Sequence, residues 1–128
     1  MLSRSTRPSL IAVIDDDISV RESVESLLKS VGFQVNTYSS AEEFIDSPRL
    51  EAADCLILDV RLDGMSGPDL QRELKTNGHS IPIVFVTAHE TEALRERMMA
   101  DGAIDCLLKP FNDDALLNAV EIALNSRG

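Results

Sequence analysis

Short apolar runs alternate along the chain with segments whose apolar residues recur every three or four positions. The apolar runs cover residues 10–14, 55–58, 83–86 and 104–108, and each leads directly into polar residues. A continuous apolar run of this length indicates a strand that is covered on both faces, as in parallel sheets. Residues 34–38 alternate between polar and apolar side chains, which predicts a fifth strand.

The segments between these runs have helical periodicity and recognisable ends. Ser19 and Glu22 have the spacing of a capping box, which predicts a helix from this point to the glycine at position 32. Further helices are predicted over residues 41–47, 68–77, 91–101 and 113–125. Five strands therefore alternate with five helices, without a repeat, a linker or a low-complexity segment.

This alternation predicts an α/β fold with a parallel sheet and right-handed crossovers. Five such units fit the flavodoxin-like, doubly wound (βα)5 arrangement, a five-stranded sheet of order 2-1-3-4-5 that reverses between the first and third strands. A chain of 128 residues is most simply one domain. We therefore expect a single domain over 1–128, with its core at about 10–125 and a flexible N-terminal arm at 1–9.

Charge and hydropathy exclude several classes of partner. The net charge of −10 argues against direct contact with nucleic acid or an anionic membrane, because both attract positive charge. No apolar stretch approaches the ~18 residues that a membrane span needs, and the apolar run after residue 9 is too short for a signal peptide. Cys55 and Cys106 lie within apolar strands without metal-ligand spacing, which predicts buried reduced thiols and a cytoplasmic location.

Polar residues that could bind an ion or take part in a reaction follow four of the predicted strands. Asp15 and Asp16 follow the first strand, Asp59 the third, Thr87 the fourth and Lys109 the fifth. The carboxyl ends of parallel strands meet at one edge, and the strand order places the three acids side by side. Crowded carboxylates repel one another and need a cation, and oxygen ligands of this kind suit Mg²⁺.

Each of these features has an ordinary interpretation when it stands alone. Acids before a helix are favoured by the helix dipole, and Asp59 could cap the loop that follows it. Lys109 could be a surface lysine, Thr87 an ordinary strand-end hydroxyl, and Phe111 a packing residue. The coincidence of all the polar residues at the ends of successive strands favours a functional site.

The chain resembles a response-regulator receiver domain of two-component signalling over roughly residues 10–124. The resemblance depends on Ile-Asp-Asp-Asp at 14–17, Leu-Asp-Val-Arg at 58–61, Gly67, Val-Thr-Ala at 86–88 and Leu-Lys-Pro-Phe at 108–111. Ser-Ala-Glu-Glu-Phe at 40–44 and Met-Ser-Gly at 65–67 are most similar to FixJ-type receivers, which often precede a helix-turn-helix output domain.

The resemblance implies that Asp59 is the phosphoacceptor, which takes a phosphoryl group from a phosphohistidine of a sensor histidine kinase. Asp16, Asp59 and the main-chain carbonyl of Arg61 would bind Mg²⁺ directly, and Asp15 would bind it through water. Phosphoryl transfer mainly requires positioning and neutralised charge, which a divalent ion and one lysine supply.

The resemblance also implies roles for the other matched residues. Lys109 would contact the phosphoryl oxygens, and Thr87 would move to hydrogen-bond them. Ala88, Arg61 and His89 would govern access to the group and its lifetime. The chain would then catalyse its own phosphorylation and dephosphorylation, as a signalling switch and not as a metabolic enzyme.

The sequence departs from the family pattern at two places. The loop after the acceptor has Leu62 and Asp63 where Met-Pro or Leu-Pro is usual, which should loosen it. Cys106 replaces the usual Tyr or Phe that swings inward with Thr87, which predicts a muted switch or one carried by other side chains. Ile122 points away from the apolar face of the last helix, and we expect it to belong to a partner surface formed by residues 91–125, which would hold effectors or a second copy.

Other classes fit less well. A phosphotransferase of the haloacid dehalogenase type needs a second Asp two residues after the nucleophile, where this chain has Arg61. A nucleotide-binding fold needs a Gly-rich turn where this chain has three acids. The expected function is therefore a phosphoacceptor receiver that controls a transcriptional output domain. The alternatives are a stand-alone receiver and a phosphorylation-independent protein-binding module.

Overall fold

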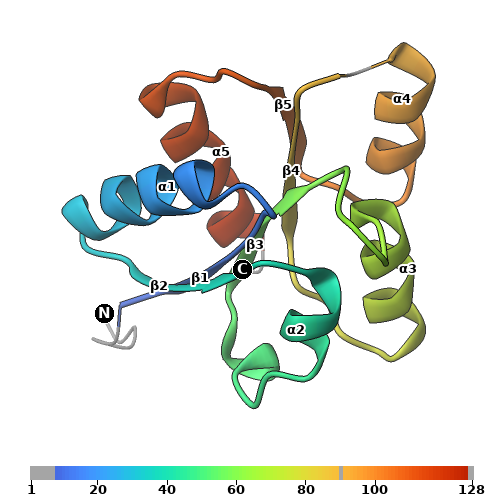
Figure 1. Cartoon of the computed structure of the whole chain (residues 1–128), viewed down its shortest axis with the longest axis horizontal. Helices are drawn as coiled ribbons and strands as arrows, with labels where there is room; N and C mark the ends of the chain where they lie inside the picture. The colour runs from blue at the N-terminus through green and yellow to red at the C-terminus, as the bar shows by residue number, and fades with distance from the viewer. Residues whose placement is uncertain (1–7, 90, 127–128) are drawn as a thin grey trace.

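The computed structural model describes residues 8–89 and 91–126, and these form a doubly wound α/β domain (Figure 1). Most of the flexible arm expected at 1–9 lies outside the described residues. The strands are β1 (Leu10–Ile14), β2 (Gln34–Tyr38), β3 (Cys55–Asp59), β4 (Ile83–Thr87) and β5 (Asp105–Leu108). The helices are α1 (Ile18–Ser30), α2 (Ala41–Ile45), α3 (Gly67–Thr76), α4 (Glu92–Ala100) and α5 (Asp113–Ser126), with a short 3-10 turn η1 (Leu50–Ala52).

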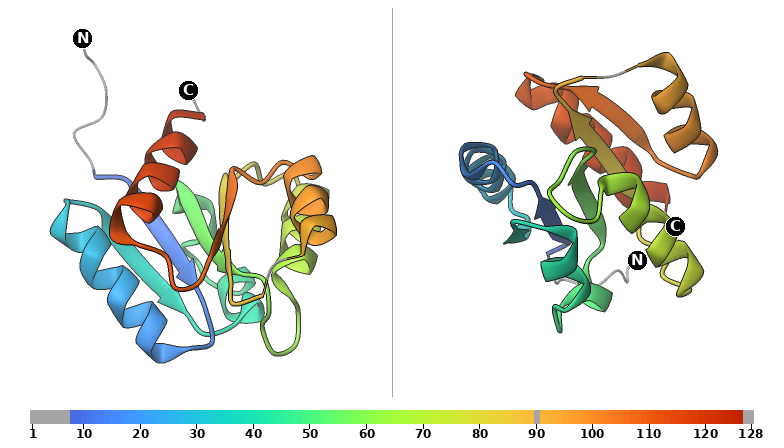
Figure 2. Two further views of the ribbon diagram at one scale, coloured as in Figure 1. Left: turned by 90° about the horizontal axis from the view of Figure 1, so that it is seen from above. Right: turned by 45° about the vertical axis from the view of Figure 1, so that its right-hand side comes forward.

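The five strands form one parallel sheet of order β2-β1-β3-β4-β5, which confirms the predicted fold class and strand order. Helices α1 and α5 cover one face of the sheet, and α2, α3 and α4 cover the other (Figures 1 and 2). Every residue of β1, β3 and β4 is buried, which explains their continuous apolar runs. The edge strand β2 is mostly half-buried, and Tyr38 at its end is its one buried residue.

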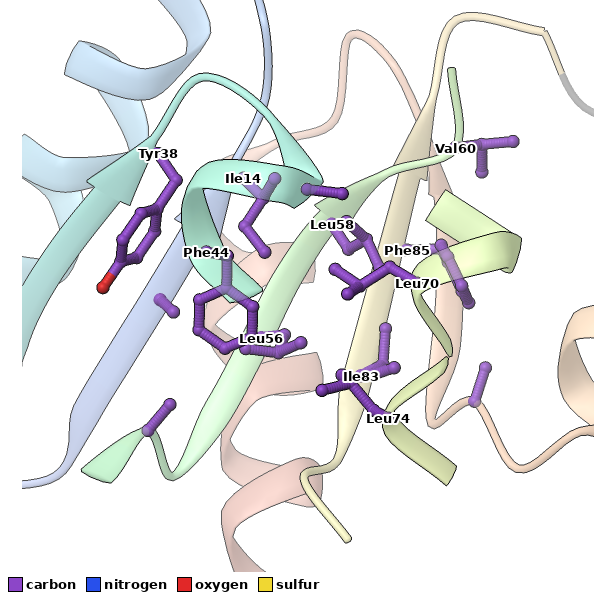
Figure 3. Close-up of a cluster of buried hydrophobic side chains, with 14 of the residues drawn as sticks. Ile14, Tyr38, Phe44, Leu56, Leu58, Val60, Leu70, Leu74, Ile83 and Phe85 are labelled. Atoms are coloured by element: carbon purple, nitrogen blue, oxygen red, sulfur yellow. The ribbon is translucent and has the colours of Figure 1, made fainter. Parts of the chain in front are cut away.

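Two separate apolar cores fill the space between the sheet and its two helical layers. On the side of α2, α3 and α4, Phe44 of α2 packs beside Tyr38 of β2, with ring centroids 5.2 Å apart at 74° (Figure 3). Leu70 and Leu74 of α3 reach the same core over Ile83. The α1 and α5 side is built around buried aliphatic side chains of all three central strands. The sheet is therefore held from both faces by burial of apolar area.

The helices lie within two residues of their predicted bounds, but the start of α1 is capped differently. Ser40, Thr91 and Asn112 each accept a backbone hydrogen bond at the start of α2, α4 and α5. Helix α1 begins at Ile18, and its N-cap is Asp17, whose side chain accepts the Ser19 N–H. The predicted capping box on Ser19 is therefore wrong, because an aspartate two residues earlier takes the cap.

The register of the sheet brings the strand ends to one edge. Ile14 pairs with Leu58, and Thr87 pairs with Leu108, so the loops after β1, β3, β4 and β5 leave the sheet together. Both cysteines are buried thiols, as predicted. Within residues 8–89 and 91–126, no helix combines the length and the apolar character that crossing a bilayer would require.

Candidate functional site

Three carboxylates meet where β1 and β3 end. Asp15, Asp16 and Asp59 each offer an oxygen, and these oxygens all lie within 4.8 Å of one another. Asp15 and Asp59 are almost fully buried, and Asp16 is exposed. Two oxygens on opposite sides of one Mg²⁺ ion are about 4.2 Å apart, since each Mg–O distance is near 2.1 Å. The donors and their spacing therefore fit a single hard divalent cation with one side open to solvent.

Lys109, which directly follows β5, reaches across the sheet edge to the same acids. Its Nζ lies 2.9 Å from Asp15 Oδ2 and 3.2 Å from Asp59 Oδ2. The lysine side chain is 19% exposed, and its backbone N–H donates to the carbonyl of Thr87 at 2.7 Å. The ammonium group thus lies between two buried carboxylates, where water screens its charge weakly.

The loops that carry the acids also fix the direction of each carboxylate. In the first acidic loop (residues 15–17), Asp15 Oδ1 accepts the Asp17 N–H at 2.9 Å. In the second acidic loop (residues 60–66), Asp59 Oδ1 accepts the Arg61 N–H at 3.1 Å. Each buried carboxylate therefore binds its own loop with one oxygen and Lys109 with the other.

The close approach of the acids changes the protonation of the site. Burial, together with the negative charge of Asp15, raises the pKa of Asp59 from its usual 3.8 to about 6, although the Arg61 N–H and Lys109 oppose the shift. Burial alone would lower the pKa of Lys109, but its contacts with Asp15 and Asp59 outweigh burial and raise it. Asp59 therefore occupies a position where a further cation would relieve its repulsion from Asp15.

Thr87 is fully buried at the end of β4, and its hydroxyl is directed towards the following loop. Thr87 Oγ1 donates to the His89 carbonyl at 2.8 Å and accepts the His89 N–H at 3.1 Å. Among the described residues, these are the hydrogen bonds of this hydroxyl, so the structure does not join it to Asp59. Ala88, His89 and Arg61 are all exposed.

Cys106 lies in the edge strand β5, opposite Phe85 of β4, and only 4% of it is exposed. The guanidinium of Arg95 from α4 binds two neighbouring residues of this strand. Its Nη1 donates to the Cys106 carbonyl at 2.7 Å, and its Nη2 lies 3.2 Å from Asp105 Oδ1. Ile122 of α5 is 51% exposed, as its helical phase predicts.

Three residues that contact these segments were not found from the sequence. Arg95 spans β5, Arg21 of α1 donates to the Asp15 carbonyl at 2.7 Å, and Glu42 of α2 accepts the Met65 N–H at 2.8 Å. The available signal for Arg21 was a cation near the start of a helix, where acids are normally preferred. Nothing in the spacing of Glu42 or Arg95 indicated their partners.

A doubly wound α/β domain with an acidic, lysine-bridged site at its strand ends is the class that these observations define. The family model described as the response regulator receiver domain matches residues 11–121. The chain therefore belongs to the response regulator receiver domains of two-component systems, which interact with histidine kinases.

Several characterised proteins are similar to the chain. It is 42% identical over 120 residues to the response regulator protein TodT of Pseudomonas putida, and these cover 94% of this chain and 53% of TodT. It is also 42% identical over 121 residues to nodulation protein W of Bradyrhizobium diazoefficiens, with the same two coverages. The chain thus spans about half the length of these curated relatives.

Solved structures agree with this assignment. The structure of the response regulator StyR has a TM-score of 0.87 and 45% identity, over 94% of this chain and 61% of StyR. The structure titled FixJ-N has a TM-score of 0.83 and 30% identity, over 94% of this chain and 96% of that one. The similarity to the FixJ-N structure agrees with the FixJ-type motifs in the sequence.

Proposed function

We propose that this chain is a phosphoacceptor receiver in which Asp59 takes a phosphoryl group from a phosphohistidine of a sensor histidine kinase. An Asp59 carboxylate oxygen attacks the phosphorus atom, an O–P bond forms, and the P–N bond to the imidazole breaks. The imidazole leaves with the bonding electron pair. Hydrolysis of the resulting acyl phosphate by water regenerates the carboxylate and releases inorganic phosphate.

The observation that carries this proposal is the position of Lys109 between Asp15 and Asp59. In a loose phosphoryl-transfer transition state, catalysis comes mainly from positioned charge, and a preorganised ammonium beside the acceptor provides it. Lys109 Nζ is 3.2 Å from an oxygen of the proposed nucleophile, so little reorganisation is needed. After transfer, the same ammonium would pair with the new phosphoryl oxygens.

Asp16, Asp59 and the main-chain carbonyl of Arg61 would hold Mg²⁺ directly, with Asp15 acting through water. When bound, this ion supplies positive charge that offsets the repulsion between the carboxylates and the incoming phosphoryl group. The cluster of oxygens within 4.8 Å and the raised pKa of Asp59 both support this assignment. Exposed Asp16 leaves the site open on the side from which a donor would approach.

The switch would begin at Thr87. Its hydroxyl would exchange the His89 backbone for a phosphoryl oxygen, while Ala88 and His89 line the approach and influence the lifetime of the acyl phosphate. Because Cys106 has no ring to follow Thr87 inward, we expect a muted response or one carried by other side chains. The bonds of Arg95 to β5 offer such a route between α4 and this strand.

The output is proposed to be transcriptional and to lie in a domain beyond this chain. The relatives TdiR of Thauera aromatica and FixJ of Bradyrhizobium diazoefficiens are named transcriptional regulatory proteins, and the chain spans 54% and 56% of their lengths. The α4-β5-α5 surface, where Ile122 and Leu108 are each about half exposed, would contact effectors or a second copy. A cytoplasmic location follows from this role.

The test is exposure of the chain to acetyl phosphate with Mg²⁺, followed by intact mass measurement. We expect a gain of about 80 Da that Asp59→Asn abolishes and EDTA prevents. Asp46→Asn, which removes an exposed acid at the end of α2, is the matched control and should retain the gain. A gain that persists in Asp59→Asn, or no gain in the wild-type chain, would contradict the proposal.

A further inference from the structure

Glu42 of α2 holds the second acidic loop from outside. Its Oε2 accepts the backbone N–H of Met65 at 2.8 Å, across a separation of 23 residues in the chain. Gly64 next to this contact has a φ of +78°, and a Cβ there would lie 2.6 Å from the same carboxylate oxygen. A side chain at position 64 would therefore strain the backbone and push the flexible end of Glu42 aside, so glycine favours this close approach.

The rest of this loop is held by backbone hydrogen bonds at its two ends and by packing of Leu62 and Met65 against the core. The Val60 N–H donates to the Val86 carbonyl, and the Gly67 N–H donates to the Val60 carbonyl, both at 3.0 Å. Among the hydrogen bonds of the described residues, the Glu42–Met65 bond is the one that ties residues 62–65 to another element. Between the ends of the loop, the one polar contact with another element among the described residues is therefore the Glu42 carboxylate, beside the apolar packing of Leu62 and Met65.

We propose that Glu42 is a positioning residue, which fixes the second acidic loop that begins after Asp59 and so strengthens the binding of a divalent cation at the acids. The part of this inference that concerns the cation rests on the proposed function. The contact between Glu42 and the loop does not. Partners that orient the ligands of a metal site affect its affinity even though they never touch the ion.

The neighbouring Glu43 provides a matched control. It lies on the same short helix and carries the same charge, but its Oε1 accepts from the N–H and the hydroxyl of Ser39. Replacement of Glu43 therefore removes an acid and weakens the start of α2 without breaking the bond to Met65. An effect common to both variants would come from charge or from helix stability, and an effect of Glu42 alone would come from the loop.

The experiment compares Glu42→Ala, Glu42→Gln and Glu43→Ala in two measurements. The first is amide hydrogen exchange of residues 61–66 without metal, and the second is a Mg²⁺ titration followed by NMR. We expect Glu42→Ala to speed exchange at Met65 and to weaken Mg²⁺ binding by roughly tenfold. Glu42→Gln keeps an acceptor oxygen and should restore both, and Glu43→Ala should change neither.

Gly64→Ala disrupts the contact between Glu42 and Met65 by a change in the loop and not in α2. A methyl group at this position would displace the Glu42 carboxylate, so this variant should reproduce the faster exchange at Met65. In the Glu42→Ala background, the added methyl group no longer meets a carboxylate, so the steric contribution of Gly64→Ala disappears. The two substitutions should therefore be less than additive, although the cost of the positive φ remains in both.

Each outcome decides one part of the inference. Wild-type exchange at Met65 in Glu42→Ala would overturn the positioning role. Faster exchange with unchanged Mg²⁺ affinity would overturn the link between the loop and the cation. A wild-type chain that binds no Mg²⁺ would overturn the proposed function and the cation part of this inference together, and the exchange data would still decide whether Glu42 holds the loop.

Discussion

The two acidic loops of the site differ in how far along the chain their supports lie. In the first loop, the Asp15 carboxylate accepts from Asp17, and the Asp15 carbonyl accepts from Arg21, so both partners come from the next six residues. In the second loop, Asp59 accepts locally from Arg61, but Met65 is held by Glu42, which is 23 residues earlier.

This difference indicates which part of the site forms with local structure and which depends on packing. In the first loop, the bonds to Asp17 and Arg21 need only the start of α1, whereas the Asp15 N–H donates to the Tyr38 carbonyl of β2 and Asp15 Oδ2 binds Lys109. In the second loop, the bond to Met65 also requires α2 to be packed on the sheet, which Phe44 and the core around it provide (Figure 3). Lys109 binds an acid of each loop, and its replacement should therefore have the largest effect on the stability of the domain.

Lys109→Met keeps most of the side-chain volume but leaves Asp15 and Asp59 buried without their cation. Since loss of one partner from a buried ion pair is strongly destabilising, we expect the free energy of unfolding at pH 7.5 to fall by about 3 kcal/mol in metal-free buffer. Urea denaturation measures this loss. It should become smaller towards pH 5, where Asp59 takes up a proton and the repulsion decreases.

The control for this variant is Lys29→Met, which breaks the exposed pair of Lys29 with Glu25 on α1. An exposed pair of this kind contributes only about 0.3–0.5 kcal/mol. Equal losses in the two lysine variants would show that the bridge between the loops carries no special energy.

Asp59→Asn should stabilise the metal-free protein at neutral pH, the opposite sign from Lys109→Met. The folded-state pKa of Asp59 is raised from 3.8 to about 6, so its favourable contribution is complete below pH 3.8 and is lost as the pH rises through about 6. At pH 7.5 the variant should therefore be more stable by about 1–3 kcal/mol, and near pH 4 the difference should vanish. Urea denaturation in EDTA across this range measures it, and a difference independent of pH would contradict the assignment.

Arg21→Ala should have the smallest effect and should stay within the first loop. Loss of its bond to the Asp15 carbonyl should cost about 1 kcal/mol and speed amide exchange at Asp17, with Met65 unaffected. Arg72→Ala, which removes an exposed pair with Asp69 in α3, is the control and should cost less. Equal exchange changes at Asp17 and Met65 would show that the two loops are one cooperative unit.

The sequence was sufficient to predict the strands, their order and the edge at which the acids meet. Buried parallel strands leave an unmistakable apolar run, and the strand order then places Asp15, Asp16 and Asp59 together with Lys109. The start of α1 was predicted wrongly because Asp17 and Ser19 are both good capping residues, and only the turn after β1 decides between them. Local spacing could not include that turn.

The residues that hold the loops of the site in place could not be predicted from the sequence, for a different reason. Glu42, Arg21 and Arg95 each bind a backbone atom, and a backbone atom has no residue type that a pattern could match. The direction of the Thr87 hydroxyl was equally hidden, because its partner is the backbone of His89. Hydrogen bonds from side chains to the main chain are thus the part of this site that could be found only in the three-dimensional structure.

Leu108 and Lys109 are consecutive residues with opposite surroundings. The leucine side chain is 52% exposed on the outer surface of the edge strand, and the ammonium of the lysine lies among buried acids. A single peptide plane joins them, and the Lys109 N–H anchors that plane to the Thr87 carbonyl. One peptide unit therefore connects the buried acids to the exposed face of β5, and no side chain lies between them along the chain.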